Sequence, residues 1–389
     1  MPERPAAPRS RVVTVATVAL VAAAAASCRL ALANLLLVVA VGAGWWAWRR
    51  GELAGRPWAR VLVLPLGVFA LLSLLSATTS LDPLASFANL PRLLVFACVP
   101  LAAALLDERW WGWLVAGLAG MGALMAVWGI VQFLQGADSL QNRIRGPLSH
   151  YMTYSGWLLL VVLVLLTELL LHPGKRVIWL LPPALLGTVA LFLTYTRNAW
   201  VGLAVGVLVL AAVWRRRLLL LYPVLAVAIW LLFPRPVLER VISTVDLRQQ
   251  ANYDRLCMVL SGVEMVRDHP WTGVGPDMVS RLYPLYRRDD APRWRVPHLH
   301  NYVLQIAAER GLGALAAYLW FLVAFFTTTW RSLPGLATQR RSAVAAALVA
   351  VAGITAAGFF EYNFWDAEIQ LLTIVLMGTS VGLCQRSVA

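Results

Sequence analysis

Residues 154–171 read YSGWLLLVVLVLLTELLL, an apolar run that carries a single charged residue, Glu168. A helix of about 20 residues is long enough to cross the hydrocarbon core of a bilayer, which is roughly 30 Å thick. No water is present there to hydrogen-bond the backbone, so a crossing segment satisfies its own peptide groups by forming a helix. The run therefore predicts a transmembrane helix.

Similar runs recur along nearly the whole chain. Of its 389 residues, 60% are hydrophobic and only 13% are charged, a composition too apolar for a soluble domain of this size. The sequence predicts an all-α, polytopic integral membrane protein with about twelve transmembrane helices, or about ten if the short first pair is counted differently. The runs lie near residues 12–27, 31–47, 61–77, 91–106, 111–135, 154–171, 177–195, 199–213, 217–233, 312–328, 343–360 and 368–384.

The first run has the outline of a secretory signal peptide. Three arginines precede it and the small-residue stretch AAAAASC ends it. A second apolar run follows directly after Cys28 and Arg29, which favours an uncleaved helical hairpin. The four cysteines have no metal-binding spacing and predict no disulfide framework, although a single bridge between Cys28 and Cys257 stays open.

The formal charge of +14 follows the order of the loops. If the N-terminus is cytoplasmic, alternate loops carry clusters of Arg and Lys, as the positive-inside rule requires. The charge therefore indicates membrane topology, and we expect no nucleic-acid partner. The clustered residues are Arg49, Arg50, Arg56, Arg60, Arg109, Lys175, Arg176, Arg215, Arg216, Arg217, Arg331, Arg340 and Arg341.

One outward loop is much longer than the others. The chain divides into residues 1–233 with transmembrane helices 1–9, a large periplasmic loop at 234–311, and residues 312–389 with helices 10–12. A loop of about 75 residues inside a compact protein is usually functional. We therefore expect the catalytic elements to lie in it.

The large loop contains two segments with helical patterns. Apolar residues recur at helical spacing over residues 253–266, and Pro270 ends that helix. The GVGP sequence at 273–276 is typical of a turn. A second, amphipathic helix is predicted over residues 302–310, before glycines that lead into the next span.

Six of the arginines in the outward loops are informative, because the positive-inside bias acts against them. Arg197 is the most informative, because it sits between two apolar runs, where a charge is costly unless it faces a polar cavity. Converging guanidinium groups bind diphosphate or carboxylate oxygens bidentately. Alternatively, single arginines extend to headgroup phosphates or pair with loop acids. The six are Arg143, Arg145, Arg197, Arg240, Arg255 and Arg267.

Residues 296–315, VPHLHNYVLQIAAERGLGAL, place His298 and His300 just before an apolar run. A neutral histidine can accept a proton from a sugar hydroxyl, so either is a candidate general base. The alternatives are a helix cap, a solvated loop, or a metal site shared with Asp268 and His269, whose spacing matches no zinc signature. If a helix starts near His300, the two side chains point in different directions, and only one faces the site.

Several of these segments together resemble the O-antigen ligase and O-antigen polymerase superfamily, and most closely its WaaL-like ligases. The resemblance covers about residues 60–384. It rests on the order of short motifs around one large outward loop. The motifs are RGPLSHYMTYSG (145–156), TYTRNAW (194–200), DHPWTGVGPDM (268–278), HNYVLQIAAERGLGAL (300–315) and FFEYNFWDAE (359–368).

The resemblance implies a GT-C-like fold and an inverting, metal-independent glycosyltransferase that needs no cofactor. Its implied donor is O-antigen polysaccharide on undecaprenyl diphosphate, and its implied acceptor is a sugar of lipid A-core, in lipopolysaccharide biosynthesis. The active site would face the periplasm from the bacterial inner membrane, among membrane lipids. A Wzy-like O-antigen polymerase uses the same donor and stays open. A flippase or transporter is disfavoured, because the polar residues gather in outward loops and no pair of broken helices recurs.

The resemblance also implies roles for individual residues. Arg197 matches the motif arginine and would hold the diphosphate, and His300 matches the motif histidine and would orient or deprotonate the acceptor hydroxyl. Asn301 would fix the ring of His300. A second histidine at 298 means that the assignment of the base can shift between the two. Substrate contacts are expected from Arg145, Arg255, Arg267, His298, Asn301, Glu361 and Asp366, of which Glu361 and Asp366 would touch acceptor sugars.

Overall fold

The computed structural model describes residues 9–172, 174, 177–220, 223, 227 and 250–386. Over these residues the protein is helical and has no strand. Eight helices are long and apolar enough to cross a membrane, and three shorter apolar helices accompany them. The predicted class, an all-α polytopic membrane protein, is confirmed. The run predicted near 217–233 lies mostly outside the described residues, as do Lys175, Arg176 and Arg240.

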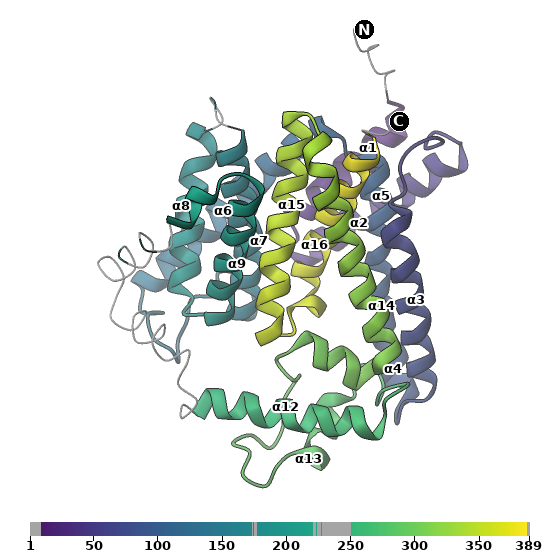
Figure 1. Cartoon of the computed structure of the whole chain (residues 1–389), viewed down its shortest axis with the longest axis vertical. Helices are drawn as coiled ribbons and strands as arrows, with labels where there is room; N and C mark the ends of the chain where they lie inside the picture. The colour runs from purple at the N-terminus through teal and green to yellow at the C-terminus, as the bar shows by residue number, and fades with distance from the viewer. Residues whose placement is uncertain are drawn as a thin grey trace.

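Eleven helices, all of them within the described residues, form a bundle in which they run roughly side by side (Figure 1). They are α1 (Arg11–Ala25), α2 (Leu30–Arg49), α3 (Arg60–Thr78), α5 (Cys98–Leu105), α6 (Glu108–Leu134), α7 (Tyr151–Leu171), α8 (Val177–Leu193), α9 (Arg197–Val213), α14 (Tyr302–Ser332), α15 (Thr338–Ala357) and α16 (Ala367–Gln385). Helix α5 ends a continuous candidate span, Pro83–Leu105, that begins with α4 (Pro83–Asn89) and η1 (Leu90–Ala97). The 3-10 turns η4 (Leu333–Gly335) and η5 (Gly358–Phe360) extend the spans of α14 and α15. The remaining elements are α12 (Gln250–Asp268), α13 (Val279–Tyr286), η2 (Arg216–Leu220) and η6 (Asn363–Trp365).

Helices α7, α15 and α16 form the centre of the bundle and are the most buried of the spans. Helix α15 packs against both α7 and α9. Two glycines allow α9 and α15 to approach closely, because a Cβ on Gly202 would lie 2.6 Å from the carbonyl oxygen of Gly353. Packing of this kind replaces the hydrophobic effect between helices that already lie in lipid.

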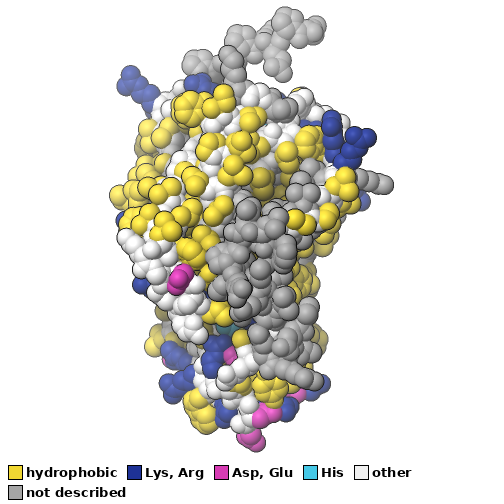
Figure 2. Space-filling view, turned by 90° about the vertical axis from the view of Figure 1, so that its left-hand side faces the viewer, with side chains coloured by type: hydrophobic (Ala, Val, Ile, Leu, Met, Phe, Trp, Pro, Cys, Tyr) yellow, Lys and Arg dark blue, Asp and Glu magenta, His cyan; other side chains and the backbone are white. Residues whose placement is uncertain are grey.

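On the face shown in Figure 2, apolar side chains are spread over the middle of the bundle, and most of the charged side chains gather toward its two ends. This distribution matches a hydrocarbon layer around the middle of the bundle and water at both ends. Figure 2 also places the acidic side chains on this face mainly at the lower end. The bundle therefore has two chemically different ends.

The end that holds both described termini, here called the basic end, is held together by arginines. Arg9, Arg56 and Arg386 come from three separate segments and donate to the carbonyl oxygens of Leu105, Ala104 and Leu106, at 2.7, 3.1 and 2.6 Å. Each arginine caps the C-terminal end of α5, where carbonyl oxygens lack helical partners.

At the opposite end, here called the site end, α12 lies across the foot of the bundle with α13 beneath it (Figure 1). The helix predicted over 253–266 is present within α12 and ends at Asp268, before His269 and Pro270. Helix α14 starts at Tyr302 as predicted and breaks at Gly311, which has φ 81°.

The loop after α12 binds to this break in α14. The N–H of Val274 donates to the carbonyl of Ala308, and the N–H of Leu312 donates to the carbonyl of Pro270, both at 2.8 Å. The predicted turn at 273–276 is therefore a docking segment that satisfies backbone groups freed by the break.

The predicted N-terminal hairpin is also present, since α1 packs along α2. Its connection reaches α7, where the indole N–H of Trp157 donates to Oγ of Ser27 at 2.8 Å. All four cysteines are buried and free, so the bridge left open between Cys28 and Cys257 does not form.

Candidate active site at the site end

Two histidines share one carboxylate. His298 and His300 lie in the loop before α14, and Glu361 lies between η5 and η6. Nδ1 of His300 is 2.9 Å from Oε2 of Glu361, and Nε2 of His298 is 3.2 Å from Oε1. The carboxylate is 5% exposed, and its Oε1 atom also accepts the backbone N–H of Tyr362 at 3.0 Å, so both buried oxygens have polar partners.

The hydrogen bonds assign a different role to each ring. Nδ1 of His298 accepts the backbone N–H of His300 at 3.3 Å, so its ring proton sits on Nε2, which lies 3.2 Å from Oε1 of Glu361. His300 donates from Nδ1 to Glu361, which leaves a lone pair on Nε2. Both nitrogens of His298 are occupied, whereas Nε2 of His300 has no hydrogen-bond partner among the described residues.

The electrostatics agree with this assignment. Burial lowers the pKa of His298 to about 4, so its ring is neutral at pH 7. Burial would raise the pKa of Glu361, but the hydrogen bond from His300, and the charge of that ring when it is protonated, outweigh burial and hold the pKa of Glu361 below its usual value. At neutral pH the cluster therefore holds an ionised carboxylate, which favours Nδ1–H on the ring of His300.

The expectation that the two histidines point in different directions is wrong. His300 has φ 51°, in the left-handed region, so the chain reverses there and no helix starts at this residue. The ring centroids of the two histidines lie 4.3 Å apart, and both rings face Glu361.

The role predicted for Asn301 belongs to Glu361. The Oδ1 atom of Asn301 caps α14 by accepting the N–H of Leu304 at 2.9 Å. Its Nδ2 group donates to the carbonyl of Phe359 at 3.0 Å. Asn301 therefore fixes η5, and the carboxylate that follows η5 fixes the ring of His300.

A buried network supports both sides of this cluster. Gln305 accepts the N–H of Leu299 at 2.7 Å and donates to Glu309 at 2.7 Å. Glu309 pairs with Arg310 at 2.6 Å, and Arg310 contacts the hydroxyl of Tyr362, next to Glu361, at 3.4 Å. The backbone between the two histidines and the backbone beside the carboxylate are thus held by one set of side chains.

The histidines open onto a cavity of ≈ 440 Å³, here called the polar cavity. Four arginines and one acid contribute to its wall, so its charge suits an anionic ligand. The structure brings together five residues predicted from sequence. They are Arg197, Arg255, His298, His300 and Asp366.

A second cavity of ≈ 350 Å³, here called the apolar cavity, adjoins it. Arg197, Arg255 and His300 line both cavities. The remaining wall of the apolar cavity is largely hydrophobic and comes from α9, α12 and η5, with Val201, Leu256, Val259, Phe359 and Phe360. The three shared residues therefore stand at the junction of a charged space and an apolar one.

Arg197 is the first residue of α9 and is 6% exposed. Its guanidinium donates to Oδ1 of Asn252, in the first turn of α12, at 2.6 Å. Arg143 lies 4.3 Å from the ring centroid of Tyr151, and burial, with the nearby charge of Arg255, lowers its pKa. The guanidinium groups are thus held apart by separate partners and keep their positive charges in one cavity.

Asp366 is the one acidic side chain in the wall of the polar cavity. Burial raises its pKa to about 7, and the nearby charge of Glu361 adds to the effect. Its Oδ2 atom accepts a hydrogen bond from the hydroxyl of Thr153 at 3.0 Å. Near pH 7 this carboxyl group therefore exchanges between an ionised and a neutral form.

Within the described ranges, three of the predicted site residues line neither cavity: Glu361, which contacts the two histidines, and two arginines. Arg145 is exposed and donates to the carbonyl of Ser149 at 3.3 Å. Arg267 pairs with Glu264 on the exposed face of α12 at 2.6 Å. Asp268, from the metal site considered above, accepts from the hydroxyl of Tyr286 instead.

Sequence reasoning did not select three residues of the polar cavity. His150 and Thr153 lie in the 145–156 motif, and Arg293 pairs with Asp254 of α12. His150 could have been selected because it lies in the same motif as Arg145. Arg293 had no comparable signal among the many arginines of the large loop.

The cluster also has the composition of a metal site. His298, His300 and Glu361 each offer one ligand atom, and these atoms lie within 4.8 Å of one another. In this arrangement, however, the nitrogens bond directly to the carboxylate. This geometry is that of a histidine oriented by a carboxylate. A metal site is the alternative, and treatment with a chelator tests it.

A comparison with known protein families finds a match for this chain. Residues 182–319 match a family model described as O-antigen ligase. Over these residues the chain is similar to the O-antigen ligase family, and the match supports membership of that superfamily. No curated protein matches the chain.

The O-antigen ligase match includes the residues at the junction of the two cavities. Arg197, Arg255 and His300 all lie within it, whereas Glu361 and Asp366 lie beyond its end. In the fold, the turn between η5 and η6, which carries Glu361, contacts the matched region at His298 and His300. The resemblance seen in the sequence is thereby confirmed at the level of the superfamily, whose members are ligases and polymerases.

Proposed function

We propose that the protein is an O-antigen ligase, an inverting glycosyltransferase that works without a metal. It moves O-antigen polysaccharide from undecaprenyl diphosphate to a sugar of lipid A-core. The enzyme lies in the bacterial inner membrane with the site end in the periplasm. The arginine clusters of the basic end support this orientation, because positive charge is retained on the cytoplasmic side.

The observation that carries the proposal is the position of His300. It lines both cavities, together with Arg197 and Arg255. The diphosphate binds to the guanidinium groups at this junction, where bidentate contacts orient it. The polyprenyl chain follows the apolar cavity, and the acceptor sugar enters the polar cavity.

The reaction needs a positioned nucleophile and a stabilised leaving group. The acceptor hydroxyl attacks the anomeric carbon as the bond from that carbon to the diphosphate oxygen breaks, so the configuration inverts. The hydroxyl proton passes to Nε2 of His300, and Glu361 stabilises the resulting imidazolium. Undecaprenyl diphosphate leaves with its charge balanced by Arg197 and Arg255.

Reconstitution tests the proposal against the polymerase and flippase alternatives. Purified protein in proteoliposomes receives the lipid-linked O-antigen donor with either lipid A-core or a second lipid-linked O-unit as acceptor. We expect a new glycosidic bond on lipid A-core alone, in the presence of EDTA and at an unchanged rate. Growth of the lipid-linked unit would establish a polymerase, and donor translocation without bond formation a flippase. Loss of transfer in EDTA, restored by a divalent ion, would contradict the arginine and histidine mechanism.

A further inference from the structure

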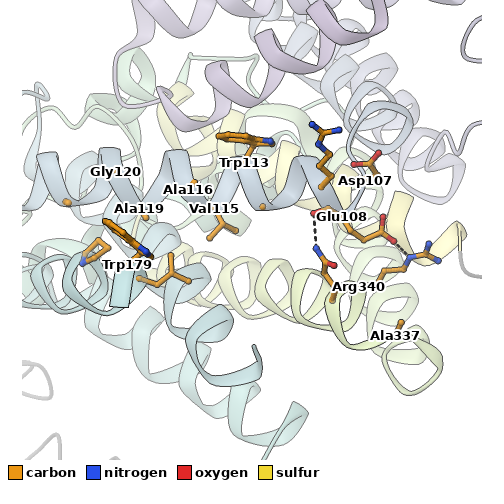
Figure 3. A pocket seen from close by; sticks show the side chains of 16 residues that line it. Asp107, Glu108, Trp113, Val115, Ala116, Ala119, Gly120, Trp179, Ala337 and Arg340 are labelled. Carbon is orange, nitrogen blue, oxygen red and sulfur yellow. Dashed lines mark hydrogen bonds and ion pairs between the residues drawn. The ribbon is translucent and has the colours of Figure 1, made fainter. Parts of the chain in front are cut away.

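A large cavity lies at the basic end, away from the histidines. It has a volume of ≈ 1250 Å³ and is bounded by α6, α8 and the start of α15. Figure 3 shows its charged residues, Asp107, Glu108 and Arg340, gathered at one end, and Trp179, Ala119 and Gly120 toward the other. The cavity is therefore amphipathic along its length.

At the charged end, two ion pairs neutralise both acidic residues, and one arginine, Arg109, is not part of either pair. Glu108 pairs with Arg340, and Asp107 pairs with Arg9. Arg109 is exposed at the rim and has no ion pair among the described residues. With two acids matched by two arginines, the guanidinium of Arg109 gives this end a net positive charge.

The apolar part is a groove along α6. Its floor consists of small residues, among them Ala116, Ala119, Gly120 and Ala123. From Arg109 to Ala123 the helix rises by about 21 Å, since each residue adds about 1.5 Å. One leaflet contributes about 15 Å of the roughly 30 Å hydrocarbon core, so the groove has the length of one acyl chain and its headgroup region.

The groove is open to an occupant from the membrane. A Cβ added at Gly120 would meet no atom within 4 Å. Trp113 and Trp179 line it and are 59% and 79% exposed, so both side chains are accessible from the membrane. The wall thus presents apolar surface at the depth of an acyl chain and a cation at the depth of a phosphate.

We propose that this groove binds one phospholipid with an anionic headgroup. Its phosphate contacts Arg109, and one of its acyl chains lies against Ala116, Ala119 and Gly120. The net positive charge of the rim selects a lipid such as phosphatidylglycerol over a zwitterionic lipid with the same chains. The site is separate from the catalytic cavities and lies in the opposite leaflet.

Lipid retention on the purified, full-length protein tests this site. Detergent-solubilised protein is equilibrated with phosphatidylglycerol or with phosphatidylcholine of the same chains, and native mass spectrometry counts the bound lipids. We expect one retained phosphatidylglycerol, with a preference of about tenfold or less, because one surface charge contributes about 1 kcal/mol. Arg109→Gln should remove the preference but keep some binding of both lipids.

A substitution that fills the groove provides a second, independent test. Gly120→Leu should displace either lipid, because its side chain occupies the acyl-chain space. Gly67→Leu is the matched control, since Gly67 of α3 also has no atom within 4 Å of an added Cβ and lies on another exposed face. Equal retention by wild type and both glycine variants would overturn the proposal. A headgroup preference that survives Arg109→Gln would overturn the role of that residue.

Discussion

Nδ1 of His300 lies 2.9 Å from Oε2 of Glu361, across 61 residues of chain. The carboxylate accepts a hydrogen bond from the Nδ1–H group and so leaves the lone pair of Nε2 free at the cavities. His298 uses the other carboxylate oxygen and the backbone N–H of His300, and both of its nitrogens are engaged. One buried acid therefore orients the pair and distinguishes its members.

Glu361→Gln tests this orientation. The amide can donate to Nδ1 and so favour the tautomer whose proton sits on Nε2, which cannot accept the hydroxyl proton. We expect the transfer rate to fall by about 10²- to 10⁴-fold, the usual contribution of a general base. The measurement is the single-turnover rate with saturating donor, at equal amounts of folded protein. A rate near that of wild type would mean that the carboxylate does not orient the base.

Arg197→Lys tests the contact with the diphosphate. An ammonium group cannot reproduce the planar fork of a guanidinium, so we expect Arg197→Ala to abolish transfer and Arg197→Lys to restore only part of it. Arg267→Ala is the control, because Arg267 is exposed and pairs with Glu264 outside both cavities. The measurement is kcat/KM for the lipid-linked donor. A fully active Lys variant, or equal losses at Arg267, would contradict the assignment.

The sequence was sufficient to predict the membrane class, the runs that become spans, and the two histidines with their neighbouring arginines. It was insufficient to predict the partner of the histidines, because Glu361 reaches them only through the packing of η5 against Asn301. It also misdirected the reasoning about side-chain directions. A left-handed residue such as His300 breaks the periodicity on which that reasoning depends.

The break in α14 permits a comparison between two neighbouring glycines. A Cβ on Gly311, at φ 81°, would lie 2.1 Å from the carbonyl oxygen of Trp271, whereas the nearest atom to a Cβ on Gly313 is 3.6 Å away. We expect Gly311→Ala to lower the midpoint of thermal unfolding strongly, and Gly313→Ala to leave it nearly unchanged. Equal midpoints for the two variants would show that the docked loop at 269–276 does not depend on the break.

Asp366 predicts a specific dependence of stability on pH. Burial raises its pKa from 3.8 to about 7 in the folded protein. Between these values the folded state holds a proton that the unfolded chain has released, so this group favours folding at the low end and its contribution is lost as pH rises through about 7. Asp366→Asn should flatten the fall of the unfolding midpoint over this window. Parallel curves for wild type and variant would contradict the raised pKa.

The central claim is that Nε2 of His300 accepts the proton of the acceptor hydroxyl. The most direct measurement compares glycan transfer to lipid A-core by His300→Ala and His298→Ala, at matched amounts of folded protein. We predict that His300→Ala loses about 10²- to 10⁴-fold in rate while donor binding persists, and that His298→Ala loses clearly less, because it acts through Glu361. An inactive His298→Ala beside a nearly normal His300→Ala, or full activity in both, would contradict the claim.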